Sequence, residues 1–424
     1  MLANLLRKSK PNQQTQTSRD PALLLQKDSC AAMDFGDDLM IGTTPQPDFN
    51  LSPDLHRMSI TEANSNMKVQ DFLLIKVIGK GSFGKVMLVR KRQGADKDRI
   101  YAMKVLHKDN VAKRNQVEHT KTERSVLGMV SHPFIVRLRY AFQTKKKLYF
   151  VMDYCSGGEL FYHLQRAGRF SENRTKFYAA EIVLALEHLH SLGVVYRDLK
   201  PENVMLDSEG HIVITDFGLS KEGIEDNSSA HSFCGTPEYL APEILTRSGH
   251  GRAADWWSLG ALVYEMLTGM PPFYSRSRER LFVKILKSTL RLPRFFSPEA
   301  QSFIGSLLDR NSATRLGSTG DADEVKSHPF FAGVDWQALS SRSLTPPFKP
   351  PEPADVADTR NFENEFTSMP LDSVENTPGE SSLVSLTNRF SGFTYQDGGA
   401  GQSMREFQIQ AGMTSMSPQE EKKS

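Results

Sequence analysis

The sequence has few cysteines and no excess of charge of either sign. Only three cysteines occur among 424 residues, Cys30, Cys155 and Cys234, and no two of them have Cys-x-x-Cys spacing. We therefore expect neither a disulfide framework nor a structural zinc site, and the composition fits a reducing compartment. Because 52 Lys and Arg face 50 Asp and Glu, the formal net charge is only +2. This balance gives no signal for bulk binding to nucleic acid.

Long apolar runs are also missing. No uninterrupted run reaches the roughly 18 residues that a membrane-spanning helix needs. The opening stretch MLANLLRKSKPNQQ lacks the long apolar core and small-residue cleavage site of a secretory signal. With 39% hydrophobic and 24% charged residues, the composition is that of a soluble globular protein. We expect no nucleic-acid partner, no membrane insertion, a monomer, and a cytoplasmic or nuclear location.

Composition and hydrophobic periodicity divide the chain into four parts. Residues 1–68 are polar and poor in aromatic residues, which predicts a disordered extension. Periodic patterns run through 72–331, the predicted folded domain. Residues 332–403 form a Pro-rich and polar tail, and 404–424 are predicted to be disordered. The tail carries isolated aromatic residues that we expect to anchor it on the folded domain, plain disorder being the alternative: Phe348, Phe362, Phe366, Phe390, Phe393 and Tyr395.

Within the folded domain, strand patterns precede helix patterns. Apolar runs predict strands within 71–92, 99–106 and 146–153. Apolar residues spaced three and four apart predict helices within 116–130 and 175–193. The expected fold class is therefore α+β, with a strand-rich lobe followed by a helix-rich lobe and no internal repeat.

A glycine-rich turn lies between the first two predicted strands. Gly79, Gly81 and Gly84 have G-x-G-x-x-G spacing, and Val86 follows two positions later. Without a Cβ, glycine lets backbone N–H groups approach a polyphosphate closely. A dinucleotide-binding turn would lead into a helix, whereas this turn leads into a strand. The pattern therefore favours a cover over phosphates, with an ordinary hairpin as the alternative.

Several charged residues then follow in an ordered series. Lys104 lies in the apolar strand YAMKVL, and Glu123 on a predicted helix could supply the anion that holds it. Asp198 lies in the stretch VVYRDLKPENVML, where unpaired charges among apolar residues would be costly. Asp216, in ITDFGLSK, and Asn203 offer oxygens suited to a divalent cation. Each residue alone could be solvent-facing or form a structural ion pair, but the whole series in this order points to one site.

These motifs resemble the eukaryotic protein kinases over Phe72 to Phe331. The resemblance implies a two-lobed fold, a small strand-rich N-lobe and a larger helical C-lobe, with a site for ATP and Mg²⁺. YRDLKPEN and FCGTPEYLAPE are similar to AGC serine/threonine kinases, in which Tyr196 commonly replaces the usual His. The tail motif FSGFTYQ resembles the hydrophobic motif of that group. The ribosomal protein S6 kinases are the most similar, with protein kinase B as the alternative, although the N-terminus shows no lipid-binding domain.

The kinase resemblance implies a role for each charged residue. Asp198 would orient the substrate hydroxyl and accept its proton, and Lys200 would neutralise charge on the transferring phosphoryl group. Asn203 and Asp216 would hold Mg²⁺. The residues expected at the ATP site are Ile78, Gly79, Gly81, Gly84, Val86, Ala102, Lys104, Glu123, Met152, Asp153, Cys155 and Met205. A pseudokinase scaffold is the rival interpretation, and the presence of every catalytic residue argues against it.

The resemblance also implies specificity and regulation. Glu159 and Glu202 match positions that accept substrate arginines, which predicts Arg at three and five residues before the Ser or Thr. Ser232 aligns with the activation-loop acceptor, whose phosphate Arg197 and His119 would bind. Thr394 lies in the hydrophobic motif.

The resemblance implies two further regulatory sites. Thr377, rather than Ser373, is taken as the turn-motif site because Pro378 follows it. The acidic stretch DFGDDLM at 34–40 resembles a short docking motif for the TOR complex, although Gly36 and Asp37 depart from that motif. A phosphoinositide-dependent kinase is the expected upstream enzyme.

Overall fold

The computed structural model describes residues 67–81, 84–218, 220, 237–249, 251–371 and 389–397, which all lie in the compact unit from Asp48 to Ser424. Within these ranges, no helix is both long enough and apolar enough to cross a bilayer. The expectations for Cys30, Cys234, Ser232, Ser373, Thr377, the 34–40 stretch and the disordered segments 1–66 and 404–424 concern residues outside the described ranges.

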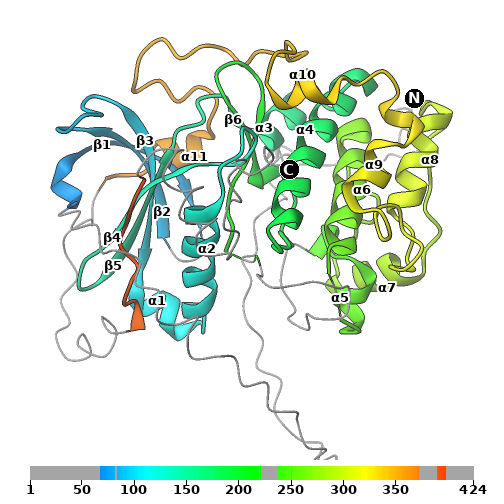
Figure 1. The fold of residues 1–424 in the computed structure, drawn as a ribbon, viewed down its shortest axis with the longest axis horizontal. Helices are drawn as coiled ribbons and strands as arrows, with labels where there is room; N and C mark the ends of the chain where they lie inside the picture. The colour runs from blue at the N-terminus through cyan, green and yellow to red at the C-terminus, as the bar shows by residue number, and fades with distance from the viewer. Residues whose placement is uncertain are drawn as a thin grey trace, which may run out of the picture. The chain divides into compact units, whose positions relative to one another are not determined.

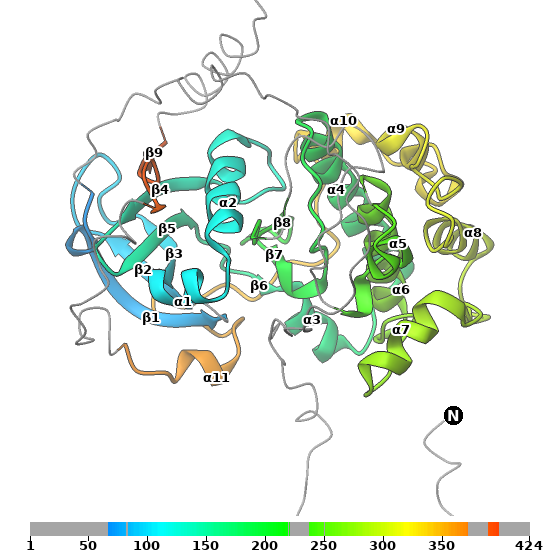
Figure 2. The same cartoon turned by 90° about the horizontal axis from the view of Figure 1, so that it is seen from below.

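An antiparallel sheet forms the small lobe (Figure 1), in the strand order β1-β2-β3-β5-β4-β9. Its strands are β1 (Phe72–Lys80), β2 (Gly84–Lys91), β3 (Ile100–His107), β4 (Leu138–Gln143), β5 (Lys147–Asp153) and β9 (Tyr395–Gln396). Helices α1 (Lys108–Lys113) and α2 (Val117–Met129) pack beside the sheet, and α11 (Asn364–Thr367) of the tail contacts β1 (Figure 2). The strand-rich lobe expected from the sequence is confirmed.

The two-residue period of β3 separates two faces of this sheet. Tyr101, Met103 and Val105 are buried in one apolar cluster. The intervening Ala102 packs in a different cluster, and Lys104 forms its ion pairs with residues outside the sheet. Because alternate side chains of a strand point to opposite faces, one short sequence builds core and site together.

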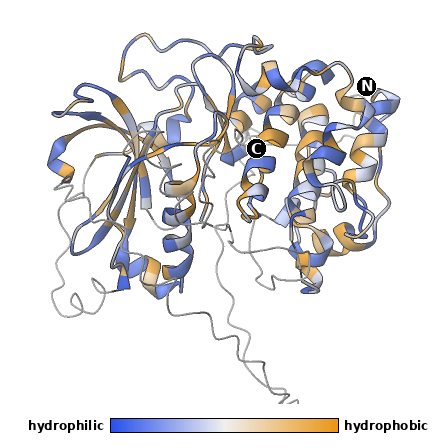
Figure 3. Cartoon of the chain, viewed as in Figure 1, coloured by the Kyte–Doolittle hydropathy of each residue, from blue (hydrophilic) through white to orange (hydrophobic). Residues whose placement is uncertain are grey.

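Helices make up most of the large lobe. They are α3 (Leu160–Ala167), α4 (Glu172–Ser191), α5 (Pro242–Thr246), α6 (Ala253–Thr268), α7 (Arg278–Lys287), α8 (Pro298–Leu307), α9 (Asp321–Lys326) and α10 (Trp336–Ser340). A small sheet adds β6 (Gly158–Glu159), β7 (Val204–Leu206) and β8 (Ile212–Ile214). Short 3₁₀ turns lie at Val69–Asp71, Pro201–Asn203, Pro237–Tyr239 and Pro329–Phe331. Hydrophobic residues occur both in the strands and in these helices (Figure 3), and each lobe has an apolar core.

Helix α4 shows how local sequence sets an element's ends. Ser171 caps its N-terminus, because the Ser171 hydroxyl accepts a hydrogen bond from the N–H of Arg174 at 3.3 Å. Gly193 follows its C-terminus with φ of +71°, a conformation that glycine adopts without strain. The helix expected within 175–193 is confirmed, and it begins three residues earlier because of the serine cap.

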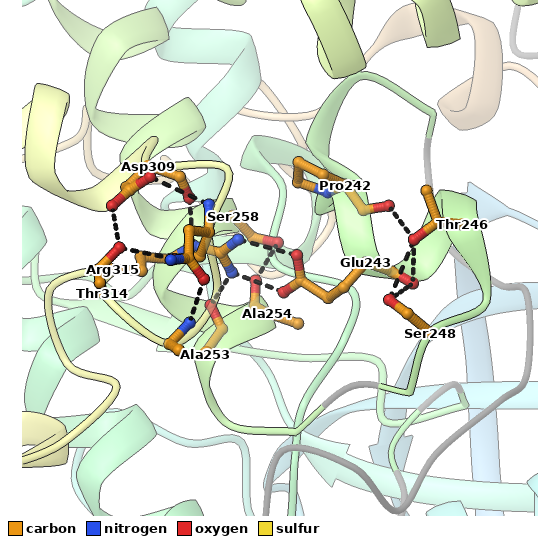
Figure 4. A network of polar contacts seen from close by, with 12 residues as sticks. Pro242, Glu243, Thr246, Ser248, Ala253, Ala254, Ser258, Asp309, Thr314 and Arg315 are labelled. Atoms are coloured by element: carbon orange, nitrogen blue, oxygen red, sulfur yellow. Dashed lines mark hydrogen bonds and ion pairs between the residues drawn. The ribbon is translucent and has the colours of Figure 1, made fainter.

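A buried ion pair fixes α5 to the rest of the large lobe. Arg315 is fully buried, and its guanidinium donates to the two carboxylate oxygens of Glu243 at 2.6 and 2.8 Å (Figure 4). The same side chain donates to the carbonyl oxygens of Ala253 at 2.7 Å and Asp309 at 2.9 Å. These four bonds satisfy both charges, which is what makes a buried pair tolerable.

The tail is anchored to both lobes by its aromatic residues. Phe348 lies against the large lobe, with its ring centroid 4.0 Å from the Arg174 guanidinium and 5.1 Å from the His163 ring. Phe362 is 7% exposed and stacks on Tyr154 at 5.7 Å. In the small lobe, Phe390 and Phe393 are 0% and 3% exposed. The expected anchoring role is therefore confirmed, and the Pro-rich stretch before Phe362 forms no helix, as expected, although bends and a turn at 354–357 interrupt it.

Candidate active site

Three charged side chains from three separate elements meet at one point. The Nζ of Lys104 lies 2.6 Å from a Glu123 carboxylate oxygen and 3.1 Å from an Asp216 carboxylate oxygen. Lys104 comes from β3, Glu123 from α2, and Asp216 from the segment after β8. Burial alone would lower the pKa of Lys104, but the charges of Asp216 and Glu123 raise it well above its usual range. Lys104 is therefore charged and held in place.

A second cluster occupies the loop between α4 and β7. The Nζ of Lys200 lies 2.9 Å from one carboxylate oxygen of Asp198, and the Nδ2 of Asn203 donates to the same oxygen at 2.7 Å. Burial, assisted by the charge of Asp216, raises the pKa of Asp198 to about 6 despite these two partners. The carboxylate is therefore ionised at neutral pH and still basic enough to accept a proton.

The backbone is strained at one residue of the loop between α4 and β7 and at one residue after β8, and the loop is firmly anchored. Arg197 has φ of +66° and Asp216 has φ of +60°, values that few non-glycine residues adopt. The carboxylate of Asp255, at the start of α6, accepts the N–H of Tyr196 at 2.8 Å and that of Arg197 at 2.7 Å. His190 supports Asp255 through a further bond of 2.9 Å. The strain thus persists because surrounding contacts impose it.

An apolar cluster lies beside Lys104, whose strand partner Val86 belongs to it. Ile78, Val86, Ala102 and Met205 belong to one apolar cluster, which brings together the residues expected to sandwich a nucleotide base. Phe362 of the tail completes this cluster. The sequence analysis did not assign Phe362 to the site, because nothing local links it to strands more than 250 residues earlier.

The end of β5 forms the edge of the pocket. Met152 and Cys155 are buried in the large core. Asp153 instead points its carboxylate at Arg99, at 3.1 Å, and at Arg139, at 2.7 Å. The N–H of Asp153 donates to the carbonyl oxygen of Arg137 at 3.1 Å, and the carbonyl oxygen of Cys155 accepts from the N–H of Gly158 at 3.3 Å. The expected contact of this backbone with a base stays a prediction.

The three glycines of the turn differ in how much space the structure leaves for a side chain. A Cβ at Gly84 would lie 1.7 Å from the carbonyl oxygen of Val105, so packing demands glycine there. A Cβ at Gly81 would meet no atom within 4 Å, and one at Gly79 would make ordinary contacts with Val86. Packing does not explain the glycine at 81, whereas close approach of a phosphate to the backbone would.

Asn203 and Asp216 fit a divalent cation. The Nδ2 of Asn203 is used by Asp198, which orients its other atom, the Oδ1 acceptor, away from those bonds. Asp216 uses Oδ1 for Lys104 and for the N–H of Gly218, and its side chain is 48% exposed. Burial acts to raise the pKa of Asp216, but the charges of Lys104 and Lys200 outweigh burial and lower it. Anionic and amide oxygens of this kind suit Mg²⁺.

Acidic residues gather on the substrate side of the loop. Glu202 has one carboxylate oxygen that is buried without a hydrogen-bond partner among the described residues. Its charge raises the pKa of Glu238 and Glu265, both of which burial already raises, and that of Glu265 reaches about 7. Glu159 lies in β6, opposite Met205 in β7. The sequence analysis missed Glu238 and Glu265, whose proximity to Glu202 is created only by the fold.

The predicted regulatory residues are placed in part. Thr394 is exposed, and its carbonyl oxygen accepts from Arg124 at 3.2 Å. The amide of Gln143 donates to the carbonyl oxygen of Phe390 at 2.8 Å, as the expected docking near Gln143 requires. Burial lowers the pKa of His119, and the nearby charge of Arg197 lowers it further.

Comparison with known protein families gives the class of the protein. Residues 72–331 match the protein kinase domain, and residues 354–395 match the protein kinase C-terminal domain. The chain therefore belongs to the protein kinase family and has its α+β fold with a strand-rich N-lobe.

Individual relatives narrow this class. The chain is 55% identical to protein kinase 2 of Dictyostelium discoideum over 77% of its own length and 67% of that protein. It is 52% identical to ribosomal protein S6 kinase beta of Caenorhabditis elegans, over 80% of the chain and 61% of the relative. It is 50% identical to RAC-beta serine/threonine-protein kinase A of Xenopus laevis, over 74% and 64%. The chain is a serine/threonine protein kinase of the AGC group, for which ATP is the substrate and Mg²⁺ the cofactor.

Proposed function

We propose that the chain transfers the terminal phosphoryl group of ATP to Ser or Thr of basic protein segments, with the residues placed above in named roles. The observation that carries this proposal is the convergence of Lys104, Glu123 and Asp216, close to the Asp198 cluster. A pseudokinase would have no need to keep all these groups paired and charged.

The chain's own residues divide the work of the reaction. Lys104 binds the inner phosphates of ATP, and Glu123 keeps its Nζ in position. Asp198 orients the substrate hydroxyl and accepts its proton, while Lys200 offsets the charge that develops on the transferring group. Mg²⁺, held by Asn203 and Asp216, supplies electrostatic stabilisation of the phosphate oxygens. Most of the rate enhancement then comes from positioning and electrostatics.

The acidic surface supports a preference for arginine. Glu202 and Glu159 would offer their carboxylates to substrate guanidinium groups, and Glu238 and Glu265 add negative charge near Glu202. Bidentate pairing would favour Arg over Lys. We propose Arg at three and five residues before the acceptor, as in a ribosomal protein S6 kinase-like enzyme acting in growth and nutrient signalling. A RAC-like or protein kinase B-like specificity is the alternative, because relatives of both kinds match equally well.

We also propose regulation by phosphorylation. Phosphate on Ser232 would be bound by Arg197 and His119, and phosphate on Thr394 would favour the docked tail. Thr377 is the proposed turn-motif site. The proposed upstream enzymes are a phosphoinositide-dependent kinase and the TOR complex, and the proposed location is cytoplasmic, with nuclear entry.

Catalytic variants test the proposed chemistry. Asp198→Ala and Lys104→Met should each abolish phosphoryl transfer, because positioned charges of this kind contribute several kcal/mol to transition-state stabilisation. The measurement is steady-state transfer to an Arg-containing peptide, with the melting temperature as the control for folding. Near-normal turnover of either folded variant, free of contaminating kinase, would refute the assignment.

A positional-scanning peptide array tests the proposed specificity separately. Glu202→Gln and Glu159→Gln should each weaken use of Arg-containing peptides by about 1.5–3 kcal/mol in kcat/KM, the range for a charge-assisted bond. Glu209→Gln, an exposed carboxylate away from the substrate surface, is the matched control. An Arg preference unchanged in both test variants would show that these carboxylates do not read the substrate.

A further inference from the structure

A hollow on the large lobe is lined by residues that the proposed active site does not use. It has a volume of about 430 Å³ and is lined by Arg169–Glu172, Leu267 and Phe295–Phe296. These residues come from the turn between α3 and α4, the end of α6, and the segment between α7 and α8. None of them belongs to the ATP pocket or to the acidic substrate surface. We call this hollow the Phe295 groove.

The Phe295 groove presents apolar surface that the protein itself does not cover. Phe295 is 58% exposed, although its neighbour Phe296 is almost completely buried. Met270, which is 49% exposed, lies at the same edge, because Gly269 packs directly against Gly168 beside Arg169. Large side chains left exposed together on a folded domain commonly mark an interaction surface.

The walls of the groove are held in place by specific contacts. The Arg169 guanidinium lies 4.6 Å from the centroid of the Phe295 ring, and Phe296 meets that ring edge-on at 5.1 Å. The N–H of Phe170 donates to the carbonyl oxygen of Met266 at 2.7 Å, which ties the turn to the end of α6. A partner would thus meet a groove that is already formed, and little ordering cost would fall on this side of the interface.

The charge around the groove is positive. Arg169 and the exposed Arg294 form no ion pair with any residue in the described part of the chain. Glu172, the one carboxylate in the lining, is already used, because its oxygens accept from the hydroxyl and the N–H of Ser297 at 2.7 and 3.4 Å. The groove therefore leaves guanidinium groups without a counter-charge and exposes no free carboxylate.

We propose that the Phe295 groove is a docking site for a short acidic segment of a partner protein, anchored by one aromatic or large aliphatic side chain. The volume is enough for one such anchor with its neighbouring backbone. Phe295 and Met270 would contact the anchor, while Asp or Glu residues beside it would pair with Arg169 and Arg294. This site goes beyond the proposed phosphoryl transfer and would select partners by a feature other than the arginines near the acceptor.

Fluorescence anisotropy with the full chain tests the proposal. The probe is a fluorescein-labelled peptide with a single Phe flanked on both sides by Asp and Glu. Replacing its Phe by Ser, or its acids by Asn and Gln, should weaken binding about tenfold or more, because anchor and charge act together. Raising the salt concentration should also weaken binding.

Protein variants locate the binding. Arg169→Glu and Phe295→Ser should each weaken binding of the probe at least about tenfold, with Met270→Ser as the second apolar variant should Phe295→Ser not fold. Arg92→Glu and Leu73→Ser, which change an exposed arginine and an exposed apolar residue of the small lobe, should bind the probe like the wild type. Transfer to a short Arg-containing peptide should be the same in all folded variants.

Two results would overturn the proposal. The first is that Arg169→Glu, Phe295→Ser and Met270→Ser all bind the probe with the same affinity as the wild type. The other is binding of phosphatidylserine vesicles, lost in Arg169→Glu, without binding of the peptide, which would make the groove a lipid site. Because these readouts do not depend on phosphoryl transfer, failure of the docking proposal and failure of the proposed function are distinguishable.

Discussion

Arg124 connects the tail to the helix that carries Glu123. Its guanidinium donates to the carbonyl oxygens of Phe393 and Thr394, both at 3.2 Å, and lies 5.0 Å from the ring centroid of Tyr395. The two bonds are long, so we assign about 1 kcal/mol to each and up to about 1 kcal/mol to the ring contact. Arg124→Ala should therefore weaken tail docking by about 2–3 kcal/mol, which is about thirty- to 150-fold.

The activity assay must separate the tail from the helix itself. We expect Arg124→Ala to lower kcat/KM of the Ser232-phosphorylated full chain toward that of a chain lacking residues 386–424. In the truncated chain the same substitution should have almost no further effect, since its partners are absent. Lys121→Ala, on the same helix, is the control. If Arg124→Ala slows both chains equally, Arg124 acts within α2 and the proposed coupling is wrong.

Three further outcomes follow from buried contacts. Burial alone would lower the pKa of His190, but its hydrogen bonds to Asp255 and Asp321 raise that pKa to about 9. The protonated His190 therefore stabilises the folded protein fully below pH 6.5, and this stabilisation is lost as the pH rises through about 9. Urea unfolding should therefore show the stability difference between wild type and His190→Gln shrinking by roughly 3 kcal/mol over that interval, and a constant difference would contradict the assignment. Arg315→Met should destabilise the protein by about 3–5 kcal/mol in the same measurement, and adding Glu243→Leu should recover part of the loss, because the carboxylate is no longer stranded. Phe362→Ala should raise the KM for ATP about tenfold with little change in the KM for peptide, and equal changes in both would show that Phe362 does not belong to the nucleotide pocket.

Local patterns in the sequence were sufficient to predict the main strands and helices. The strands around the glycine-rich turn and helix α4 follow directly from hydrophobic spacing, as the structure confirms. The contact between Lys104 and Glu123 was also predicted, because a lysine in an apolar strand needs an anion to hold it, and the structure confirms the pair. Short elements such as α1, with only Val111 and Lys108 buried, carry too little periodicity to be recognised.

What the sequence could not reveal depends on contacts between distant segments. Phe362 reads as an isolated aromatic until the tail places it on Tyr154. Glu265 lies on α6 as an ordinary helical carboxylate, and only the fold sets it near Glu202. Arg315 reads as one more surface charge, yet it is fully buried. In each case long-range packing overrides local preference, and no single-sequence pattern encodes it.

The path of the tail bears on how the two lobes lose their structure. Phe348 is held by the large lobe, Phe362 by the segment between the lobes, and Phe390 by the small lobe. When the small lobe unfolds, the tail loses its apolar contacts there. The other end of the same tail, at Phe348, packs against the large lobe. Domains that share such contacts melt together, because neither retains its full free energy of folding once the other has opened. The tail thus adds apolar contacts that couple the unfolding of the two lobes, beyond the buried core that residues of both lobes already share.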